Sequence, residues 1–341
     1  MSNRKTRYFV AISGAILAVG LGVGLTASYM GLPVSVFSRA AGPDELQYVP
    51  ADAAVVAYAN VRDVMNSEFR QRFKSLEPSQ EHKNEFEEKT GINFDQDVDS
   101  VTAAVMPKDG MANHPAEAFL ILARARYQPG RLESLALEHG AQVTDYNGKR
   151  IILAKEGAAP QNASHEDMAF GFVEPDLVAF GSLSAVKASI DAHAGNHNVV
   201  SNNEMMKLVN DIQNSNAWAV GRFDAIAAKA GLPDELQAQM PAITWFSAAG
   251  HINGGLSGHF KAQTKDEATA KNLRDVMNGF VAMARMQAAS KPAMQQMVDS
   301  LQISGEGNNV GLAFTVPTDV LDVLEGVAKG HQAMPRKPQL Q

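Results

Sequence analysis

The chain has 341 residues, 45% of them hydrophobic and none of them cysteine. It can therefore bury one large core or two ordinary ones, while disulfides, thiolate metal sites and a cysteine nucleophile are excluded. The formal charge is −7, but residues 1–40 hold four basic residues and no acid, so the other 301 carry 26 basic and 37 acidic residues, a balance of −11. An acidic body repels phosphate backbones, which disfavours nucleic acid as a partner.

An uncharged run near the start predicts a membrane anchor. It covers residues 8–38, and a helix needs only about 20 residues to cross the hydrocarbon. We predict a transmembrane helix over residues 8–32, after a basic tail over residues 1–7 that the positive-inside bias keeps in the cytoplasm. This predicts a single-pass protein of the bacterial inner membrane with a periplasmic body.

The alternative is a signal peptide cleaved near Ala40, which would release a secreted protein. The uncharged run is longer than the about 7 to 15 apolar residues of a signal peptide, which favours the anchor. Within the run, Gly20 and Gly24 stand four residues apart. Such spacing can bring two membrane helices together as a homodimer, although glycine is also simply frequent in membrane helices.

A juxtamembrane linker is predicted over residues 33–45, followed by a first α+β half over residues 46–200. Valine-rich and alternating stretches predict strands, and apolar residues at helical spacing predict helices. Asn-Gly, the strongest short hairpin turn signal, occurs at Asn147-Gly148 and again at Asn253-Gly254. In chain order we predict strand 55–61, helix 62–76, strands 101–106 and 118–127, a helix from 129 to His139-Gly140, hairpin 142–146 with 149–154, strands 168–173 and 177–181, and helix 182–194.

The second half is predicted over residues 201–330, with a disordered tail over residues 331–341. Its predicted elements are helix 203–213, strand 218–223, hairpin 243–250 with 256–263, helices 266–289 and 292–300, hairpin 301–304 with 310–316, and helix 318–329. Both halves follow the order strand, strand, helix, strand, strand, helix. This predicts an α+β fold of antiparallel sheets covered by helices, with a duplicated ββαββα unit in one sheet or two.

Three short phrases carry a resemblance to a known family: Leu46-Gln47-Tyr48-Val49-Pro50-Ala51-Asp52-Ala53, Thr90-Gly91-Ile92-Asn93-Phe94-Asp95-Gln96-Asp97-Val98 and Leu177-Val178-Ala179-Phe180-Gly181-Ser182. Here the sequence resembles membrane-anchored bacterial, notably acidobacterial, envelope proteins that carry a domain of unknown function. The resemblance covers most of residues 44–325. It implies no activity and no functional residues.

The sharpest enzymatic hypothesis rests on Ser184 and Lys187, one helical turn apart, where an unprotonated lysine would activate the serine for acyl transfer. Ser201-Asn202-Asn203 and Lys89-Thr90-Gly91 are similar to the other two elements of penicillin-recognising enzymes. Their order in the chain differs from that of those enzymes, and serines at this point favour a helix cap instead.

Two groups of residues suggest metal sites, and neither fits well. His193 and His197 are four residues apart near Asp191, but Gly195 ends the predicted helix between them. Asp95, Asp97 and Asp99 alternate like calcium ligands without the glycine and glutamate of a calcium loop. His251 and His259 are expected as surface or partly packed residues. We predict no metal site, no cofactor and no catalytic residues.

A cluster of methionines lies on the helices predicted over residues 266–300, at Met277, Met283, Met286, Met294 and Met297. Core packing is the favoured interpretation because other apolar residues continue the same spacing, and a groove for an apolar partner is the alternative. We therefore predict a non-enzymatic, membrane-tethered module that binds an envelope protein or an apolar ligand. The alternative is an envelope-acting serine hydrolase or transferase that uses Ser184 and Lys187.

Overall fold

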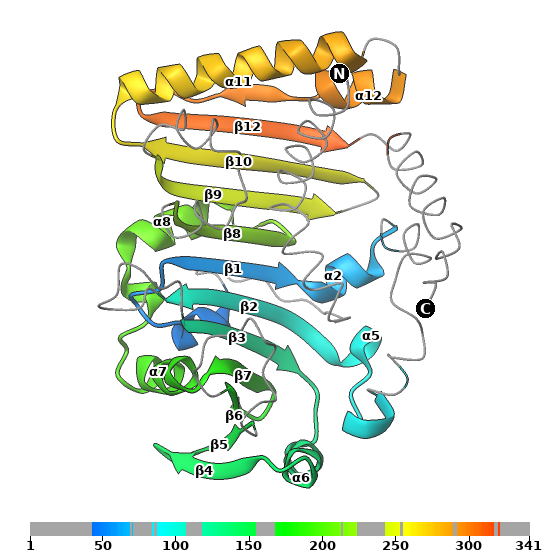
Figure 1. Ribbon diagram of the computed structural model, residues 1–341, viewed down its shortest axis with the longest axis vertical. Coiled ribbons are helices and arrows are strands. Elements are labelled where there is room, and N and C mark those ends of the chain that lie inside the picture. The colour runs from blue at the N-terminus through cyan, green and yellow to red at the C-terminus, as the bar shows by residue number, and fades with distance from the viewer. Residues whose placement is uncertain are drawn as a thin grey trace, which may run out of the picture.

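The structure is a computed structural model that describes residues 43–70 except 69, 84, 87–106, 118–154, 168–223 except 213, 243–288 except 253–254, 292–316 and 320. Within these ranges every strand belongs to one antiparallel sheet of twelve strands. The sheet runs through the middle of the molecule, with helices beside it (Figure 1). The question of one sheet or two is thereby answered, and the mixture of helices with antiparallel strands confirms the α+β class.

The first seven strands occupy one side of the sheet. They are β1 (Val55–Asn60), β2 (Val98–Met106), β3 (Ala118–Ala125), β4 (Gln142–Tyr146), β5 (Lys149–Leu153), β6 (Met168–Glu174) and β7 (Leu177–Ser182). Their helices are η1 (Asp44–Tyr48), α2 (Val61–Asn66), α5 (Phe94–Asp97), α6 (Pro129–Glu138) and α7 (Leu183–Ala194). Asn147 (φ 48°) and Gly148 (φ 75°) form the predicted turn of the β4–β5 hairpin, both in the left-handed region that such a turn requires.

The other five strands are β8 (Ala217–Arg222), β9 (Ile243–Ile252), β10 (Leu256–Thr264), β11 (Gln302–Ser304) and β12 (Asn309–Val316). Their helices are η3 (Val199–Ser201), α8 (Asn203–Ile212), α11 (Glu267–Ala288) and α12 (Pro292–Asp299). The order across the whole sheet is β11-β12-β10-β9-β8-β1-β2-β3-β7-β6-β5-β4. The antiparallel pair β1–β8 therefore joins the two sides at the middle.

The two sides share one arrangement of strands. On one side β1, β2 and β3 are followed by β7, and on the other β8, β9 and β10 are followed by β12. In each series the fourth strand comes after a helix in the chain and pairs with the third strand. The β4–β5 hairpin extends only the first side among the described strands.

The main core lies between the sheet and the elements η1, η3, α7 and α8. Buried residues alternate along β2, as a strand with one face on a core requires. Val56 of β1 and Trp218 of β8 belong to this core, whereas Ala59 of β1 belongs to a separate cluster on the opposite face of the sheet. The first face, under α7 and α8, is the one that carries the candidate site.

Some predicted bounds differ from the structure. Within the range 62–76 of one predicted helix, α2 ends at Asn66 because Ser67 takes an extended backbone. The Ser67 hydroxyl donates to the Val64 carbonyl oxygen at 2.5 Å. β2 begins at Val98, three residues before the predicted start. The predicted linker 33–45 overlaps η1, where Glu45 and Leu46 are buried. The helix 318–329, apart from residue 320, and the tail 331–341 lie outside the described residues.

The predicted membrane helix also lies outside the described residues, since it covers residues 8–32 together with Gly20 and Gly24. Where the chain is described, no helix is both long and apolar enough to cross a membrane. The anchor, the homodimer through Gly20 and Gly24 and the location therefore stay predictions.

Candidate functional site

A groove lies between α8 and the strands of the C-terminal side of the sheet. Helix α8 begins after Asn202, whose side-chain oxygen accepts from the Met205 amide at 3.1 Å, as a helix cap does. Met205, Val209 and Ile212 recur at helical spacing and are buried against the sheet. The flank of α8 that carries Glu204, Lys207, Leu208 and Asp211 therefore faces along the sheet rather than into it, and these four residues line the groove.

The sheet forms the floor of the groove through two rows of side chains. Trp245 of β9 pairs with Gln263 of β10, which pairs with Asn309 of β12. In the next row on the same face, Lys261 of β10 lies between Ser247 of β9 and Gly311 of β12. Gly311 adds no side chain, and a Cβ there would come within 2.6 Å of the Ser304 hydroxyl. The absence of a side chain at Gly311 therefore lets Ser304 lie over this position, beside Lys261.

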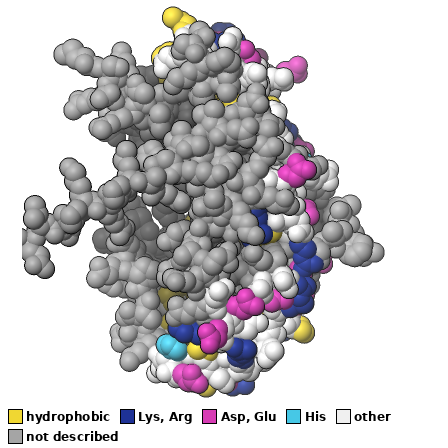
Figure 2. Space-filling view, turned by 90° about the vertical axis from the view of Figure 1, so that its right-hand side faces the viewer, with side chains coloured by type: hydrophobic (Ala, Val, Ile, Leu, Met, Phe, Trp, Pro, Cys, Tyr) yellow, Lys and Arg dark blue, Asp and Glu magenta, His cyan; other side chains and the backbone are white. Residues whose placement is uncertain are grey.

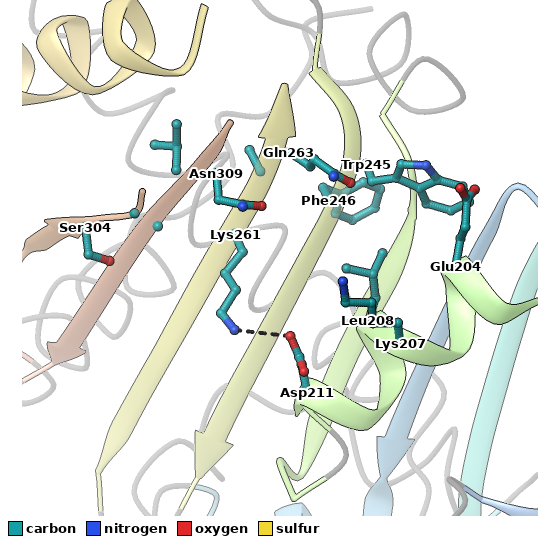
Figure 3. A pocket seen from close by; sticks show the side chains of 14 residues that line it. Glu204, Lys207, Leu208, Asp211, Trp245, Phe246, Lys261, Gln263, Ser304 and Asn309 are labelled. Carbon is teal, nitrogen blue, oxygen red and sulfur yellow. Dashed lines mark ion pairs between the residues drawn. The ribbon is translucent and has the colours of Figure 1, made fainter. Parts of the chain in front are cut away.

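The groove encloses about 450 Å³, within the roughly 300–1,000 Å³ typical of small-molecule sites. Figure 3 shows the lining side chains arranged across the strands, with Trp245 beside Glu204 at one end and Ser304 at the other. An ion pair crosses it between Lys261 Nζ and Asp211 Oδ2 at 3.5 Å, and the two side chains are 51% and 50% exposed. A ligand can therefore reach both charges from solvent.

The chemistry of the groove favours binding. Its side chains offer carboxylates, ammonium groups, amides, one hydroxyl and the partly exposed indole of Trp245. Among the described residues no group of three or more histidines and acids could hold a metal ion. His259 stands two residues before Lys261 on β10, and burial, followed by the nearby Lys261 charge, lowers its pKa, which favours its neutral form at pH 7.

A second polar cluster lies on the same face of the sheet in the N-terminal side, and it is closed. Arg124 of β3 donates from Nε to Glu45 Oε1 at 2.8 Å, and from Nη1 to Asp176 at 2.8 Å and Glu174 at 3.3 Å. The Ser100 hydroxyl donates to Glu45 Oε1 at 2.7 Å. The Glu45 side chain is only 4% exposed. Burial acts to lower the pKa of Arg124, but the acids, Glu45 foremost, outweigh it and raise that pKa.

Tyrosines close the rest of this cluster. Tyr48 donates its hydroxyl to Glu174 Oε1 at 3.0 Å, and its ring stacks on His193 with centroids 4.1 Å apart. Tyr127 donates its hydroxyl to the Glu174 carbonyl oxygen at 2.8 Å. Burial raises the pKa of both tyrosines and of Tyr58 far above the ordinary value. The contacts of Glu45 and Tyr48 fasten η1 to the sheet, so the centre of the cluster is structural, while the Glu174 and Asp176 side chains at its outer side are 33% and 50% exposed.

The three motifs of the enzymatic hypothesis do not form a common site, although Ser184 and Lys187 both lie on α7. Ser184 lies in the first turn of α7, and Ser182 caps that helix, its hydroxyl accepting from the Ala185 amide at 3.4 Å. The Lys187 ammonium lies over the Tyr146 ring, 5.1 Å from its centroid. Thr90 and Gly91 lie beside α6, where Arg131 donates to the Lys89 carbonyl oxygen at 3.1 Å.

The faces of the sheet separate these motifs. Helix α7 packs on the core that contains Val56, whereas Ile92, next to Gly91, belongs to the cluster of Ala59 on the opposite face. Asn202 of the serine-asparagine-asparagine motif caps α8 and donates to the Ala51 carbonyl oxygen at 3.3 Å. Each motif thus has a local structural role.

The residues considered as metal ligands have other contacts. α7 ends at Ala194, before His197, as expected. Asp191 accepts from the Tyr146 hydroxyl and from Asn147 Nδ2, both at 2.7 Å. Asp97 and Asp99 pair with arginines, Asp97 with Arg126 at 3.3 Å and Asp99 with Arg62. These carboxylates are therefore occupied by donors of the chain itself.

The interpretation of the methionines as core residues is wrong for the middle of α11. This helix buries alanines, namely Ala270, Ala284 and Ala288, and exposes Phe280 by 44%, Met283 by 51% and Met286 by 81%. In Figure 1, α11 lies along β12 at the end of the sheet. Small alanines let the helix approach the sheet closely, which leaves the large apolar residues on its outer side.

Sequence reasoning missed the groove. Trp245, Lys261 and Asn309 belong to no motif, and only the pairing of β9, β10 and β12 brings them together. One usable signal was Trp245 itself, one of only two tryptophans in the chain. Glu45 and Arg124 were also missed, since 79 residues separate them.

The fold and these two polar clusters define an α+β protein built on one large antiparallel sheet. Within that class, the chain belongs to the family described as protein of unknown function (DUF3352), whose family model matches residues 11–254. No curated protein matches the chain. Among solved structures, it is similar to one described as "Structure of crystal form I of TP0453", with 12% identity, 85% of this chain and 99% of that chain covered, and a TM-score of 0.42.

Proposed function

We propose that this chain is a non-enzymatic binding module of the bacterial envelope, which takes its ligand in the groove beside α8. The observation that carries the proposal is the groove itself, a hollow of about 450 Å³ whose indole, amides and charged side chains stay accessible to solvent. An enzyme of the penicillin-recognising kind is disfavoured, because Ser184 and Lys89-Thr90-Gly91 belong to elements on opposite faces of the sheet.

The location is part of the proposal. The uncharged run over residues 8–38 and the basic residues before it support a membrane tether over residues 8–32 with the body in the periplasm. A reporter enzyme that works only in the cytoplasm should be inactive when fused after Gln341 and active when fused after Arg7. Activity of the Gln341 fusion would contradict the proposed topology.

The groove is tested by filling it. Asn309 is an exposed side chain that lines the groove, so Asn309→Trp should block the hollow at little cost in stability. Asn210→Trp is the control with the same substitution, because Asn210 is an exposed residue of α8, the helix beside the groove, but does not line the groove itself.

The measurement is the melting temperature of the full chain in detergent, with and without a protein-free small-molecule extract of bacterial envelopes. A ligand that binds only the folded state raises the melting temperature. We expect a rise in the parent protein and in Asn210→Trp, and none in Asn309→Trp. An equal rise in both variants would place binding elsewhere, and no rise in the parent protein would contradict a ligand-binding role.

A further inference from the structure

The charges of the groove balance. Glu204 and Asp211 oppose Lys207 and Lys261, and the Lys261 ammonium already lies 3.5 Å from the Asp211 carboxylate. A strongly charged ligand gains little from a site that is neutral as a whole. Much of the groove surface is apolar, but the half-exposed charges of Lys261 and Asp211 reach into the hollow, and a fatty chain would bury them without a polar partner. The ligand that fits is polar and uncharged.

Trp245 gives the groove one flat apolar wall. Its side chain is partly buried and packs against the main core, while the remainder lines the hollow beside Glu204 (Figure 3). The face of an indole carries negative charge density and attracts groups with positive edges. The C–H face of a sugar ring is such a group, whereas its hydroxyls point outward around the ring.

The polar side chains of the groove suit hydroxyl groups. The Gln263 amide lies next to Trp245 in the strand register, and Asn309 lies next to Gln263. Amides both donate and accept hydrogen bonds, and carboxylates accept while ammonium groups donate. A hydroxyl, which also donates and accepts, can therefore pair with any of them.

The direction of the groove decides between a saccharide and a peptide. Its lining comes from β9, β10, β12 and β11 in turn, so it spans three strand spacings of about 4.8 Å, roughly 14 Å across the sheet. That length takes more than one sugar ring. A peptide strand binds along an unpaired sheet edge, whereas this groove lies on the face of the sheet, across β9 and β10, which are both paired on both sides.

We propose that the groove binds a neutral oligosaccharide, with one ring stacked on Trp245 and hydroxyls bonded to Gln263, Asn309 and the Lys261–Asp211 pair. This inference rests on the proposed binding function and names its ligand class. The probes are cellotriose, maltotriose and tri-N-acetylchitotriose, with octanoate and trialanine as apolar and peptide competitors.

The experiment is calorimetric titration of the full chain in detergent, followed by tryptophan emission. We expect saturable binding of at least one trisaccharide, weakened about tenfold or more by Trp245→Ala and abolished by Asn309→Trp. Asn210→Trp should bind like the parent protein. Because Trp218 is buried, with 2% of its surface exposed, the emission change should come from Trp245 and be absent in Trp245→Phe.

Two outcomes would overturn the inference. One is that no trisaccharide binds at about 10 mM, well above the millimolar Kd of a weak site. The other is that octanoate or trialanine binds in the groove, with a loss in Asn309→Trp, while the trisaccharides do not. Either result leaves the binding function standing if the envelope extract still raises the melting temperature in a groove-dependent way. If the extract effect is lost as well, both the oligosaccharide inference and the proposed binding function are contradicted.

Discussion

The two sides of the sheet share one arrangement of polar residues, but these residues have different roles. In the N-terminal side a cation near the end of the third strand, Arg124, pairs across to a serine of the second strand, Ser100. In the C-terminal side the equivalent third strand carries Lys261, which pairs across to Ser247. Both cations lie on the face under α7 and α8, and an acid from a neighbouring helix, Glu45 or Asp211, meets each one.

The difference lies in the burial of the acid from the covering helix, Glu45 or Asp211, since the outer acid Asp176 of the N-terminal cluster is also 50% exposed. Glu45 accepts from both Arg124 and Ser100 and is 4% exposed on its side chain. The Asp211 side chain is 50% exposed and lies 3.5 Å from Lys261, and the buried Ser247 hydroxyl has no hydrogen-bond partner among the residues that the structure describes. The polar residues of the N-terminal cluster therefore stabilise the fold, whereas those of the C-terminal cluster stay accessible to a ligand.

The cause of this difference is the element that covers each cluster. η1 places Glu45, Leu46 and Tyr48 directly over the N-terminal cluster, and all three are buried. α8 buries one face against β8 and β9 but leaves Asp211 at its exposed flank. A polar row on a sheet thus becomes a structural cluster or a binding groove according to what packs above it.

The largest expected effect comes from breaking the closed cluster. Glu45→Gln removes the charge that faces Arg124 in a buried setting, and should cost about 2–3 kcal/mol of unfolding free energy. Asp211→Asn, the matched change in the open cluster, should cost less than about 1 kcal/mol because both partners are solvated. Urea unfolding of the two variants measures this, and equal losses would contradict the distinction between closed and open clusters.

The next effect is a loss of stability at alkaline pH, which should come from the N-terminal side because Tyr48, Tyr58 and Tyr127 all belong to it. Burial raises the pKa of each above the ordinary value of 10.0. The folded protein therefore holds these protons more tightly than the unfolded chain, so the resulting stability is complete below pH 10 and is lost as the pH rises above it.

The measurement is tyrosinate absorbance during a rapid alkaline titration, compared with the same titration in urea. Native protein should show delayed ionisation of these three tyrosines, and the unfolded chain should not. Ionisation of all the tyrosines near pH 10 in the native protein would show that the cluster is open to solvent.

Most of the fold could be predicted because its signals are local. Asn147-Gly148 predicts its hairpin turn, and the apolar spacing of α8 predicts a helix over nearly the observed residues. The continuous sheet could not be predicted, because the pairing of β1 with β8 joins segments more than 150 residues apart. Nothing in either strand alone identifies its neighbour.

The candidate site was beyond prediction for the same reason. Lys261 and Asp211 come from a strand and a helix, and their separation in the chain gives no helical or strand periodicity. The outer face of α11 was wrongly predicted to pack in the core, for a different reason. Phe280 and Met283 continue an apolar spacing typical of a core-facing helix, but the alanines beside them pack on the sheet instead.

The smallest expected effect distinguishes the two serines. Ser100→Ala should destabilise the protein by about 1–2 kcal/mol, because buried Glu45 loses a donor. Ser247→Ala should be neutral or stabilise by up to about 1 kcal/mol, because it removes a buried hydroxyl that lacks a partner in the described part of the chain.

Urea unfolding with and without bound ligand separates the alternatives for Ser247. If the substitution leaves ligand affinity unchanged, the hydroxyl is only a buried polar group under α8. If it weakens both the unligated fold and ligand binding, then Ser247 has a donor or acceptor in solution, and the C-terminal cluster is closed in the same way as the N-terminal one. The contrast drawn between the two sides of the sheet would then be wrong at its central position, opposite Lys261.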